Sequence, residues 1–473
     1  MSNTSQASAR IESLLDENSY DEIGAMVTAR STDFNTDPGA APTDGVITGY
    51  GLINGSLVYV YSQDASVMGG SVGEMHAKKI VSLYSMAMKT GAPVIGLIDS
   101  TGLRLMEATD ALEAFGEIYK AQAMASGVIP QITAVFGSCG GGLALFPSMT
   151  DFTFIEESKG KLFVNSPNAV SGNYEEKLDT AAAAFRSTQS GDVDVVAGDD
   201  IYDQIRLLVS MLPENNEENG AYEECTDDLN RLCTDLSACA SDASVAFSRI
   251  ADDQAFFEVK ADYAKSMVTG FMRLNGITVG AVGNRSEKFD DEGKVAEKFD
   301  KVLTPDACLK AAEFVNFCDA FDIPVVSFTD IKGFETTMDA EKKLSGALAK
   351  LTFAFANATV PKINVITGSA FGSAYVVMNS KSLGADMVFA WSGASVGMMD
   401  ADAAAKILFE KEENKAELTA AYKDMQTSVT SAARRGYVDT IIEAQDTRKY
   451  VIGALEMLFT KREERPGRKH GAI

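Results

Sequence analysis

Apolar positions along the chain follow two spacings, one typical of helices and one typical of buried strands. In residues 76–89 they recur with a 3.6-residue period, and the resulting stripe consists of Ile80, Val81, Tyr84, Ala87 and Met88. Short apolar runs follow, such as VIGLI at 94–98 and VVSF at 325–328. Such runs suit strands that are covered on both faces. The alternation of helix and strand predicts βαβ units, a largely parallel sheet and the α/β fold class.

The pattern occurs twice. A second helix is predicted after Thr304, with Pro305 at its first position and a stripe of Cys308, Ala311, Ala312, Val315 and Cys318. The Asn-Gly turns at Asn54 and Asn275 each lead into a strand. Six positions recur at the same distance of 231 residues: Pro93/Pro324, Asp99/Asp330, Gly102/Gly333, Pro130/Pro361, Gly137/Gly368 and Gly141/Gly372. Six matches in one register predict a duplicated chain.

The region between the repeats indicates a domain boundary. Residues 186–240 contain acidic, Asn-rich stretches such as PENNEENGAYEECTDD, which predict a linker region with one or two helices. We place the boundary near Glu223 and expect an N-terminal domain at 1–222 and a C-terminal domain at 223–473. Each is long enough to enclose a core of its own.

Charge and composition argue against several classes of function. The formal net charge is −25, whereas nucleic-acid-binding surfaces are basic, so no nucleic-acid partner is expected. No stretch approaches the roughly 20 apolar residues that span a bilayer, and the N-terminus does not read as a secretory signal. We therefore expect a cytoplasmic protein whose six cysteines are reduced thiols, with no disulfide scaffold and no metal site.

The scarcity of histidine limits catalysis by side chains. The chain contains two, and His470 lies in a basic C-terminal tail. A Ser-His-Asp or Cys-His arrangement would therefore have to be built on His76. Cys139 sits in a glycine-rich turn and would then be the nucleophile, but a small buried thiol is the favoured interpretation.

Two glycine-rich turns are the strongest candidates for the chemistry. They read GSCGGGLA at 137–144 and GSAFGSAY at 368–375, and each is predicted to end a buried strand and open a helix. Such a turn leaves backbone N–H groups unpaired at a helix N-terminus, where the dipole favours negative charge. Small residues allow a ligand oxygen to approach the main chain closely. The turns predict two oxyanion holes, with close helix–strand packing as the alternative.

Two further patterns are weaker candidates. Residues 69–73 read GGSVG before a helix and could bind phosphate, yet no GK[ST] completes a P-loop. Ala87-Met88-Lys89 resembles the core of a biotin attachment site. A biotin-bearing lysine must project from an exposed hairpin, whereas Lys89 ends a predicted helix next to a core strand. We therefore expect no biotin to be attached to this chain.

Several segments resemble one enzyme family. DGVITGYGLINGSLVYVYSQD at 44–64 and GGSVGEMHAKKI at 69–80 are similar to segments of the beta-type carboxyltransferase subunits of biotin-dependent acyl-CoA carboxylases, such as propionyl-CoA carboxylase. The related alpha subunits of methylmalonyl-CoA and glutaconyl-CoA decarboxylases share this likeness. DSTGLRLMEA at 99–108 is similar to the family's DSGGARIQEG loop, and residues 256–284 and 358–391 match equally well. The resemblance extends over residues 9–473 almost continuously.

The resemblance implies two tandem crotonase-like (ClpP/crotonase) domains, each a spiral of duplicated ββα units. It implies carboxyl transfer between carboxybiotin and an acyl-CoA, with biotin on a separate carrier chain and coenzyme A as part of the substrate. The N-terminal domain would hold the acyl-CoA. By position, Gly141 and Gly142 would bind the thioester oxygen, beside substrate contacts at Gly102, Arg104 and Gly140. The family assembles as a homohexamer, a dimer of trimers, with each active site shared between subunits.

The C-terminal domain would hold biotin. By position, Ser373 and Ala374 would bind the ureido oxygen, next to Gly372, Tyr375 and Val376. The sequence departs from the family here. Ser373 stands where glycine is usual, and Val376 replaces an aspartate or isoleucine that lines the acyl pocket. The family's Arg-His pair is missing from residues 332–350, and the two aspartates at 400 and 402 replace a glycine and a lysine. These changes predict an unusual carrier partner or approach.

The resemblance leaves the direction of the reaction open. A carboxylase would act on propionyl-CoA or acetyl-CoA with a biotin carboxyl carrier protein and a biotin carboxylase subunit. The alternative is the alpha subunit of a sodium-pumping methylmalonyl-CoA or glutaconyl-CoA decarboxylase with membrane subunits, since one site catalyses both directions. A biotin-independent crotonase-fold hydrolase or isomerase is a further alternative. It would need a positioned carboxylate, for which Glu107 is the candidate.

Overall fold

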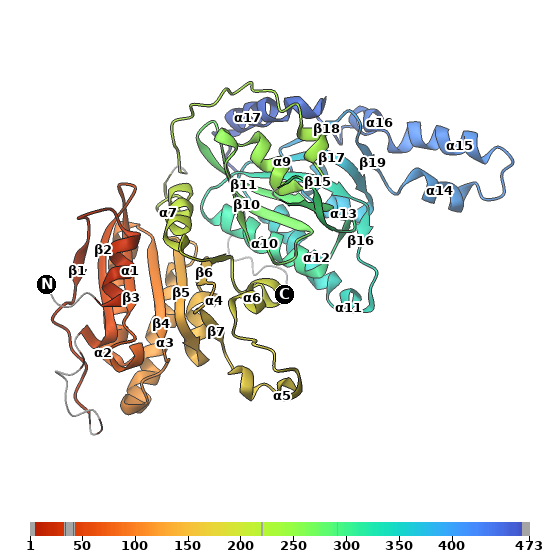
Figure 1. Cartoon of the computed structure of the whole chain (residues 1–473). Helices are drawn as coiled ribbons and strands as arrows, with labels where there is room; N and C mark the ends of the chain where they lie inside the picture. Colours follow the sequence, from red (N-terminus) through yellow and green to blue (C-terminus); the bar gives the residue numbers. More distant parts are fainter. Residues whose placement is uncertain are drawn as a thin grey trace. The chain divides into compact units, whose positions relative to one another are not determined.

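The computed structural model describes residues 5–32, 34, 41, 43–218, 221–290 and 292–465. Contacts within the chain divide it into two compact units, unit 1 (Met1–Ala221) and unit 2 (Tyr222–Ile473), which Figure 1 colours from red to yellow-green and from green to blue. The division lies next to the boundary expected near Glu223. His470 and the rest of the basic tail lie outside the described residues.

Unit 1 is built on a sheet with the strand order β1-β2-β3-β4-β5-β6-β8, and β7 pairs with β5. The first three strands pair antiparallel, with a tight Asn-Gly turn between β2 and β3, and the pairs from β3 onward are parallel, as the sequence predicts. The strands are β1 (Asp21–Ile23), β2 (Val46–Ile53), β3 (Ser56–Gln63), β4 (Val94–Ser100), β5 (Gln131–Gly140), β6 (Phe152–Glu156), β7 (Lys161–Phe163) and β8 (Val195–Ala197).

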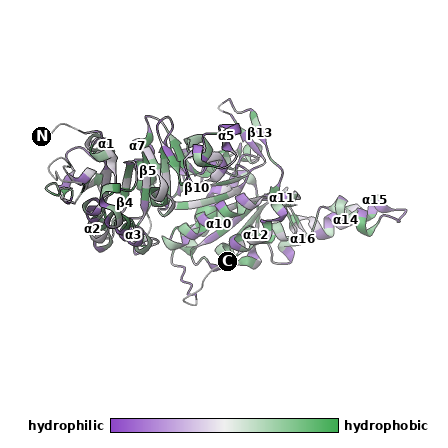
Figure 2. Ribbon diagram, turned by 90° about the horizontal axis from the view of Figure 1, so that it is seen from below, coloured by the Kyte–Doolittle hydropathy of each residue, from purple (hydrophilic) through white to green (hydrophobic). Residues whose placement is uncertain are grey.

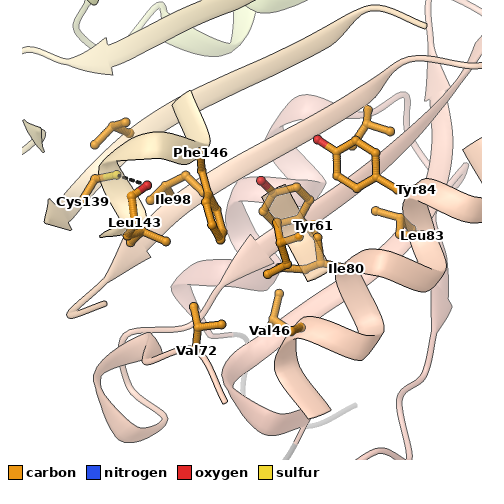
Figure 3. Packing of buried hydrophobic residues seen from close by; sticks show 14 of the residues in the cluster. Val46, Tyr61, Val72, Ile80, Leu83, Tyr84, Ile98, Cys139, Leu143 and Phe146 are labelled. Atoms are coloured by element: carbon orange, nitrogen blue, oxygen red, sulfur yellow. Dashed lines mark hydrogen bonds between the residues drawn. The ribbon is translucent and has the colours of Figure 1, made fainter. Parts of the chain in front are cut away.

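The predicted apolar helix of unit 1 packs on this sheet as α2 (Glu74–Thr90). Ile80 and Tyr84 are buried in a core cluster with Val46 and Tyr61 of the sheet, as Figure 3 shows. The other helices are α1 (Gln6–Leu14), α3 (Ala108–Ala125), α4 (Leu145–Ser148), α5 (Asn173–Glu176), α6 (Ala183–Phe185) and α7 (Ile201–Met211). α7 supplies a helix in the expected linker region, whereas β8, from the same region, completes the sheet.

Unit 2 repeats the arrangement, with the order β9-β10-β11-β15-β17-β18-β20 and β19 paired with β17. These strands are β9 (Phe256–Val259), β10 (Met267–Leu274), β11 (Ile277–Asn284), β15 (Val325–Ile331), β17 (Lys362–Phe371), β18 (Met387–Trp391), β19 (Ser395–Gly397) and β20 (Thr440–Ile442). Because strand order and pairing match unit 1 position by position, the predicted duplication is confirmed.

The predicted second helix of the repeat is α10 (Pro305–Ala320), capped by the Thr304 side chain, and its apolar stripe is buried. The other helices of unit 2 are α8 (Leu236–Cys239), α9 (Ala243–Ile250), α11 (Met338–Glu341), α12 (Leu344–Asn357), α13 (Gly372–Val377), α14 (Ala401–Leu408), α15 (Lys415–Tyr422), α16 (Val429–Arg434) and α17 (Thr447–Leu458). Two features have no counterpart in the sheet pattern of unit 1. One is the hairpin β12 (Glu287–Phe289) and β13 (Val295–Lys298); the parallel pair after it, β14 (Val302–Leu303) with β16 (Gly333–Phe334), does match unit 1, where Val72 bridges Leu103. The other is an arm formed by α14 and α15, which projects from the body of unit 2 and carries both polar and apolar residues (Figures 1 and 2).

Part of the repeated sequence serves to brace the strands. In both units an aspartate at the end of a strand faces a glycine on the next strand: Asp99 faces Gly137, and Asp330 faces Gly368. A Cβ on Gly368 would lie 2.6 Å from Asp330 Oδ1, so a larger residue would displace the carboxylate. Asp330 Oδ1 also accepts a hydrogen bond from the N–H of Ser369 at 2.8 Å. Packing therefore explains this glycine of each repeat.

A buried lysine fixes the first helix of each repeat to the sheet. Lys79 and Lys310 stand 231 positions apart, and each donates from Nζ to carbonyl oxygens at the start of a strand. Lys79 bonds the carbonyl of Val46, and Lys310 bonds that of Met267 at 2.7 Å. Burial lowers the pKa of Lys79 to about 8. The equivalence of the two contacts shows that the duplication extends to buried polar groups.

Candidate active site

The first glycine-rich turn lies where β5 ends. The strand runs to Gly140, and Gly141 then takes a left-handed φ of 64°, which strains any L side chain but not glycine. The 3-10 turn Gly141–Ala144 follows and leads into α4. The first amides of a helical turn have no acceptor within it, so their N–H groups are available to a ligand.

Gly102 lies against this turn, on the loop that follows β4. Its φ is 97°, and a Cβ there would lie 3.3 Å from the carbonyl oxygen of Gly140. Its own N–H donates to Ser100 Oγ at 3.0 Å. The structure therefore brings Gly102 next to the turn at Gly140, while the amide of Gly102 is already engaged within the protein.

The second turn has the same local geometry in unit 2. β17 ends at Phe371, Gly372 takes a φ of 63°, and α13 begins at Gly372. A Cβ on Gly372 would lie 3.2 Å from the carbonyl oxygen of Met398, which closes one side of the turn. Ser373 is exposed and Ala374 is buried. Both side chains are small, so the backbone at the start of α13 is accessible from the side of Ser373.

The two side chains that follow have different environments. Tyr375 is buried, and burial raises its pKa to about 12, so its hydroxyl stays protonated at neutral pH. Val376 is exposed next to it and presents an apolar surface beside the turn. The structure therefore groups Gly372, Ser373 and Val376 at one accessible corner, with Tyr375 supporting it from inside.

Arg104, expected to contact the substrate, has a different role. Its side chain is 2% exposed, and its guanidinium pairs with Glu107 at 2.9 Å and with Asp44. It also donates to the carbonyl of Ser71 at 2.6 Å. Its charge is paired inside the protein, where Arg104 holds the loop that carries Gly102. The family-like loop sequence alone did not reveal this, since buried and ligand-binding arginines look alike in sequence.

The titratable groups on which side-chain catalysis would depend are enclosed. His76 is fully buried, and burial, reinforced by nearby Arg104, lowers its pKa to about 3, so it is neutral in the folded protein. Its Nδ1 lies 3.0 Å from the carbonyl oxygen of Asp44. Glu107 is buried in the ion cluster and accepts the N–H of Glu74 at 2.7 Å. Neither residue can reach a substrate.

Cys139 does not form a nucleophilic site. Its side chain is buried, its Sγ lies 3.5 Å from the carbonyl oxygen of Leu143, and burial raises the pKa of the thiol. All six cysteines lie in described ranges and are free thiols. Among the residues that the structure describes, no cluster of three or more His, Cys, Asp or Glu side chains could hold a metal ion.

The weaker sequence candidates are explained by packing. A Cβ on Gly73 would lie 2.5 Å from Arg104 Nη1 and from Glu107 Oε2, so this glycine makes room for the buried ion cluster. Lys89 lies in the last turn of α2, on a helix and not on a hairpin. None of the helices in the described ranges has the length and apolar character needed to span a membrane.

An aromatic support beneath the first turn escaped the sequence analysis. Phe115 and Tyr119 of α3 and Phe146 of α4 form a cluster with ring centroids 5.5–5.9 Å apart. Tyr119 Oη donates to the carbonyl oxygen of Gly142 at 2.7 Å. The four-residue spacing of Phe115 and Tyr119, which places two aromatic side chains on one face of a helix, was the available signal. It does not by itself specify which turn lies above them.

Two equivalent α/β units, each with a glycine corner that opens a helix, are the architecture of a crotonase-like carboxyltransferase. The carboxyl transferase domain family matches residues 3–473. The chain is 39% identical over 482 residues to methylmalonyl-CoA decarboxylase subunit alpha of Veillonella parvula, covering 99% of this chain and 92% of that protein. It is 38% identical over 486 residues to propionyl-CoA carboxylase beta chain of Roseobacter denitrificans, covering 99% and 93%.

A solved structure agrees with these relatives. The crystal structure of transcarboxylase 12S, a hexamer described with methylmalonyl-coenzyme A and methylmalonic acid bound, superposes with a TM-score of 0.91 at 37% identity, covering 98% of this chain and 92% of that one. The chain therefore belongs to the carboxyl transferase domain family. It is a biotin-dependent acyl-CoA carboxyltransferase of the propionyl-CoA carboxylase type, which confirms the predicted family, fold class and enzyme class.

Proposed function

We propose that the two glycine-rich turns act as a pair of oxyanion holes during carboxyl transfer. In unit 1 the amides of Gly141 and Gly142 bind the thioester oxygen of an acyl-CoA. In unit 2 the amides of Ser373 and Ala374 bind the ureido oxygen of biotin on a separate carrier chain. One observation carries the proposal: a glycine at φ of 64° or 63° directly opens a helical turn at the same place in both units.

The chemistry follows from where negative charge develops. Carboxybiotin, when bound, supplies CO2 by breaking its N–C bond and takes the α-proton of the acyl-CoA on the same nitrogen. Loss of that proton moves charge to the thioester oxygen, where the amides of unit 1 stabilise it until the α-carbon bonds to CO2. The amides of unit 2 stabilise the charge that the ureido oxygen carries between these events. Removing one such donor typically costs about 10²–10³ in rate.

The enclosed titratable groups support a mechanism in which the chain supplies backbone amides and no catalytic base. His76 is neutral and buried, Cys139 is buried, and Glu107 is held by Arg104. A biotin-independent hydrolase or isomerase would need an accessible carboxylate or imidazole next to the first turn. Since Glu107 faces the ion cluster, the geometry favours a reaction in which the base arrives with the second substrate.

We further propose that the chain works as a homohexamer, a dimer of trimers, with its active sites shared between copies. Apolar side chains are exposed beside both turns. Leu105 and Met106 are 85% and 52% exposed near the first turn, and Met398 is 76% exposed near the second. Exposed apolar groups of this kind mark interfaces, and a second copy of the chain is the proposed occupant. The transcarboxylase 12S relative is described as a hexamer.

The proposed substrate is a small acyl-CoA such as propionyl-CoA or acetyl-CoA, and the proposed partner is a biotin carboxyl carrier protein in the cytoplasm. The relatives include both a carboxylase chain and a decarboxylase subunit, so the reverse reaction with membrane decarboxylase subunits is the second candidate. Neighbouring reading frames distinguish them. A biotin carboxylase indicates carboxylation, and a membrane subunit indicates decarboxylation.

A decarboxylation assay tests the proposal. The purified chain is incubated with malonyl-, methylmalonyl- or glutaconyl-CoA, with and without free biotin or biotinylated carrier, and loss of the acyl-CoA carboxyl group is followed. We expect turnover that depends on biotin, with different rates for the three acyl-CoA substrates. Turnover that is fully independent of biotin would contradict the proposal and favour a crotonase-fold hydrolase.

A further inference from the structure

The carbonyl oxygen of Gly142 is held on two sides. It accepts the hydroxyl of Tyr119 at 2.7 Å, and it also accepts the N–H of Leu145 within its own turn. A peptide group is planar, so fixing this carbonyl also fixes the direction of the Leu143 N–H on the same peptide. The hydroxyl of Tyr119 thereby restrains the orientation of peptide groups at the start of the first turn.

The tyrosine is itself fixed in place. Its ring meets Phe146 edge-on at 88°, with centroids 5.8 Å apart, and lies 5.9 Å from the ring of Phe115. Burial raises the pKa of Tyr119 above its ordinary value of 10, so the hydroxyl remains a donor at neutral and mildly alkaline pH. Ring position and protonation state both suit a permanent hydrogen bond to Gly142.

The contact also explains why residue 142 is glycine. A Cβ there would lie 3.0 Å from Tyr119 Oη and 3.2 Å from the ring of Phe115, which is closer than side chains normally approach. The aromatic pair occupies the side of the turn that a Cβ would need. The turn and the α3 aromatics therefore fit each other closely, and a shift in one displaces the other.

The support is not part of the duplicated pattern. The residues 231 positions after Phe115 and Tyr119 are Gly346 and Lys350, yet the second turn has almost the same φ at Gly372 as the first has at Gly141. Folding of such a turn thus does not require the aromatic pair. Its presence in unit 1 indicates that the first turn needs a support that the second turn does not need.

We propose that Tyr119 is a positioning residue that orients the first turn for the thioester oxygen of the acyl-CoA. The inference rests on the proposed function of that turn. Gly142 also carries one of the two proposed donor amides, so restraining its carbonyl limits how far that amide can turn away from the thioester oxygen. Tyr119 itself need not touch the substrate.

Kinetics of Tyr119→Phe test the proposal, since the variant keeps the ring and removes only the hydroxyl. Loss of one hydrogen bond of ordinary strength predicts a kcat about fivefold lower in the biotin-dependent decarboxylation of methylmalonyl-CoA. The KM for the acyl-CoA and the midpoint of thermal unfolding should stay close to those of the wild-type chain. Tyr20→Phe is the matched control, because Tyr20 Oη also donates to a backbone carbonyl, that of Thr48, on the β1 side of the sheet.

A double-mutant cycle tests whether the Tyr119 hydroxyl and residue 142 affect kcat through the same contact. Gly142→Ala places a Cβ against the Tyr119 hydroxyl, so its cost in kcat should be at least about threefold smaller in the Tyr119→Phe background. Wild-type kcat in Tyr119→Phe, or equal costs of Gly142→Ala in both backgrounds, would overturn the inference alone. A wild-type chain without biotin-dependent turnover would overturn the proposed function, and the inference with it.

Discussion

Gly141 and Gly142 are adjacent, but different physical constraints require glycine at each position. Gly141 has a φ of 64°, and a Cβ there would meet no described atom within 4 Å, so the constraint is backbone conformation. At Gly142 a Cβ would approach Phe115 and Tyr119, so the constraint is space. A bulky substitution at Gly142 would therefore disturb α3 as well as the turn, and Gly141 is the cleaner site for a test.

Gly141→Ala should reduce turnover without a steric collision. An L residue at this φ costs about 1 kcal/mol, and relief of that strain would shift the amides of the first turn, with a loss in kcat of about tenfold or more. Urea unfolding and the biotin-dependent decarboxylation assay measure the two effects. Gly116→Ala, within α3, is the control: a Cβ there meets no described atom within 4 Å, so the free energy of unfolding should rise slightly while kcat stays unchanged. Wild-type kcat in Gly141→Ala would place the hole elsewhere.

His76 should make the protein sensitive to acid. Its pKa is lowered from 6.5 to about 3, mainly by burial, so below pH 6.5 the unfolded chain binds a proton that the folded chain does not. The contribution of His76 to stability is complete above pH 6.5 and is lost as the pH falls toward about 3, by up to about 1.4 kcal/mol per pH unit.

The pH dependence of urea unfolding checks this expectation. His76→Asn removes the titrating group, so its free energy of unfolding should fall less steeply than that of the wild type between about pH 6 and pH 4. The comparison concerns slopes, because the variant is expected to be less stable at every pH after losing contacts to Asp44 and Gln63. Identical slopes would show that another group dominates acid unfolding.

At the scale of elements, the periodicity of apolar residues predicted the regular helices and strands but missed a strand that depends on pairing with a distant segment. The apolar stripe of α2 and the runs at 94–98 and 325–328 identified helices and strands, because burial on a fixed face leaves a regular pattern. The segment of β8 was predicted to be linker because it is short and follows a polar stretch. In the structure its pairing with β6 stabilises it as a strand. Strand pairing of this kind leaves little local trace in sequence.

The sequence predicted part of the candidate site. Both glycine corners were found, because a positive φ at the end of a strand favours glycine and the duplication placed the two in register. The contacts of Arg104 and Tyr119 were not found, since both depend on partners brought together by folding: Asp44 lies 60 residues from Arg104, and Gly142 lies 23 residues from Tyr119. The sequence predicted the candidate amides, and the structure shows the side chains that pack against them.

At the scale of the whole molecule, the arm formed by α14 and α15 should govern assembly. Ile407 and Leu408 of α14 are 71% and 58% exposed, so replacing both with glutamate should change the stability of the isolated chain by less than about 0.5 kcal/mol. If a second copy covers them, the charges would be buried without partners and the hexamer would dissociate. Sedimentation velocity should then show a smaller species than the wild type.

A matched control separates loss of an apolar contact from added charge. Lys411→Glu, just beyond α14, changes the net charge by the same amount at another exposed position and should leave the sedimentation coefficient unchanged. Biotin-dependent turnover should fall with dissociation in the double variant, because the proposed site is shared between copies. A double variant that sediments like the wild type would exclude the arm from the interface.

The β12–β13 hairpin is a suitable position for attaching a label to this enzyme. The strands before it match their unit 1 equivalents at a spacing of 221 residues, as from Val46 to Met267, and those after it at 231, as from Val94 to Val325. The hairpin is therefore extra chain that the surrounding sheet has absorbed without losing register. Its tip at Gly293 has no described atom within 4 Å of a Cβ position. Gly293 has a φ of 75° and is best kept as glycine, so a short epitope inserted beside it would report on unit 2 without disturbing the pairing of the main sheet.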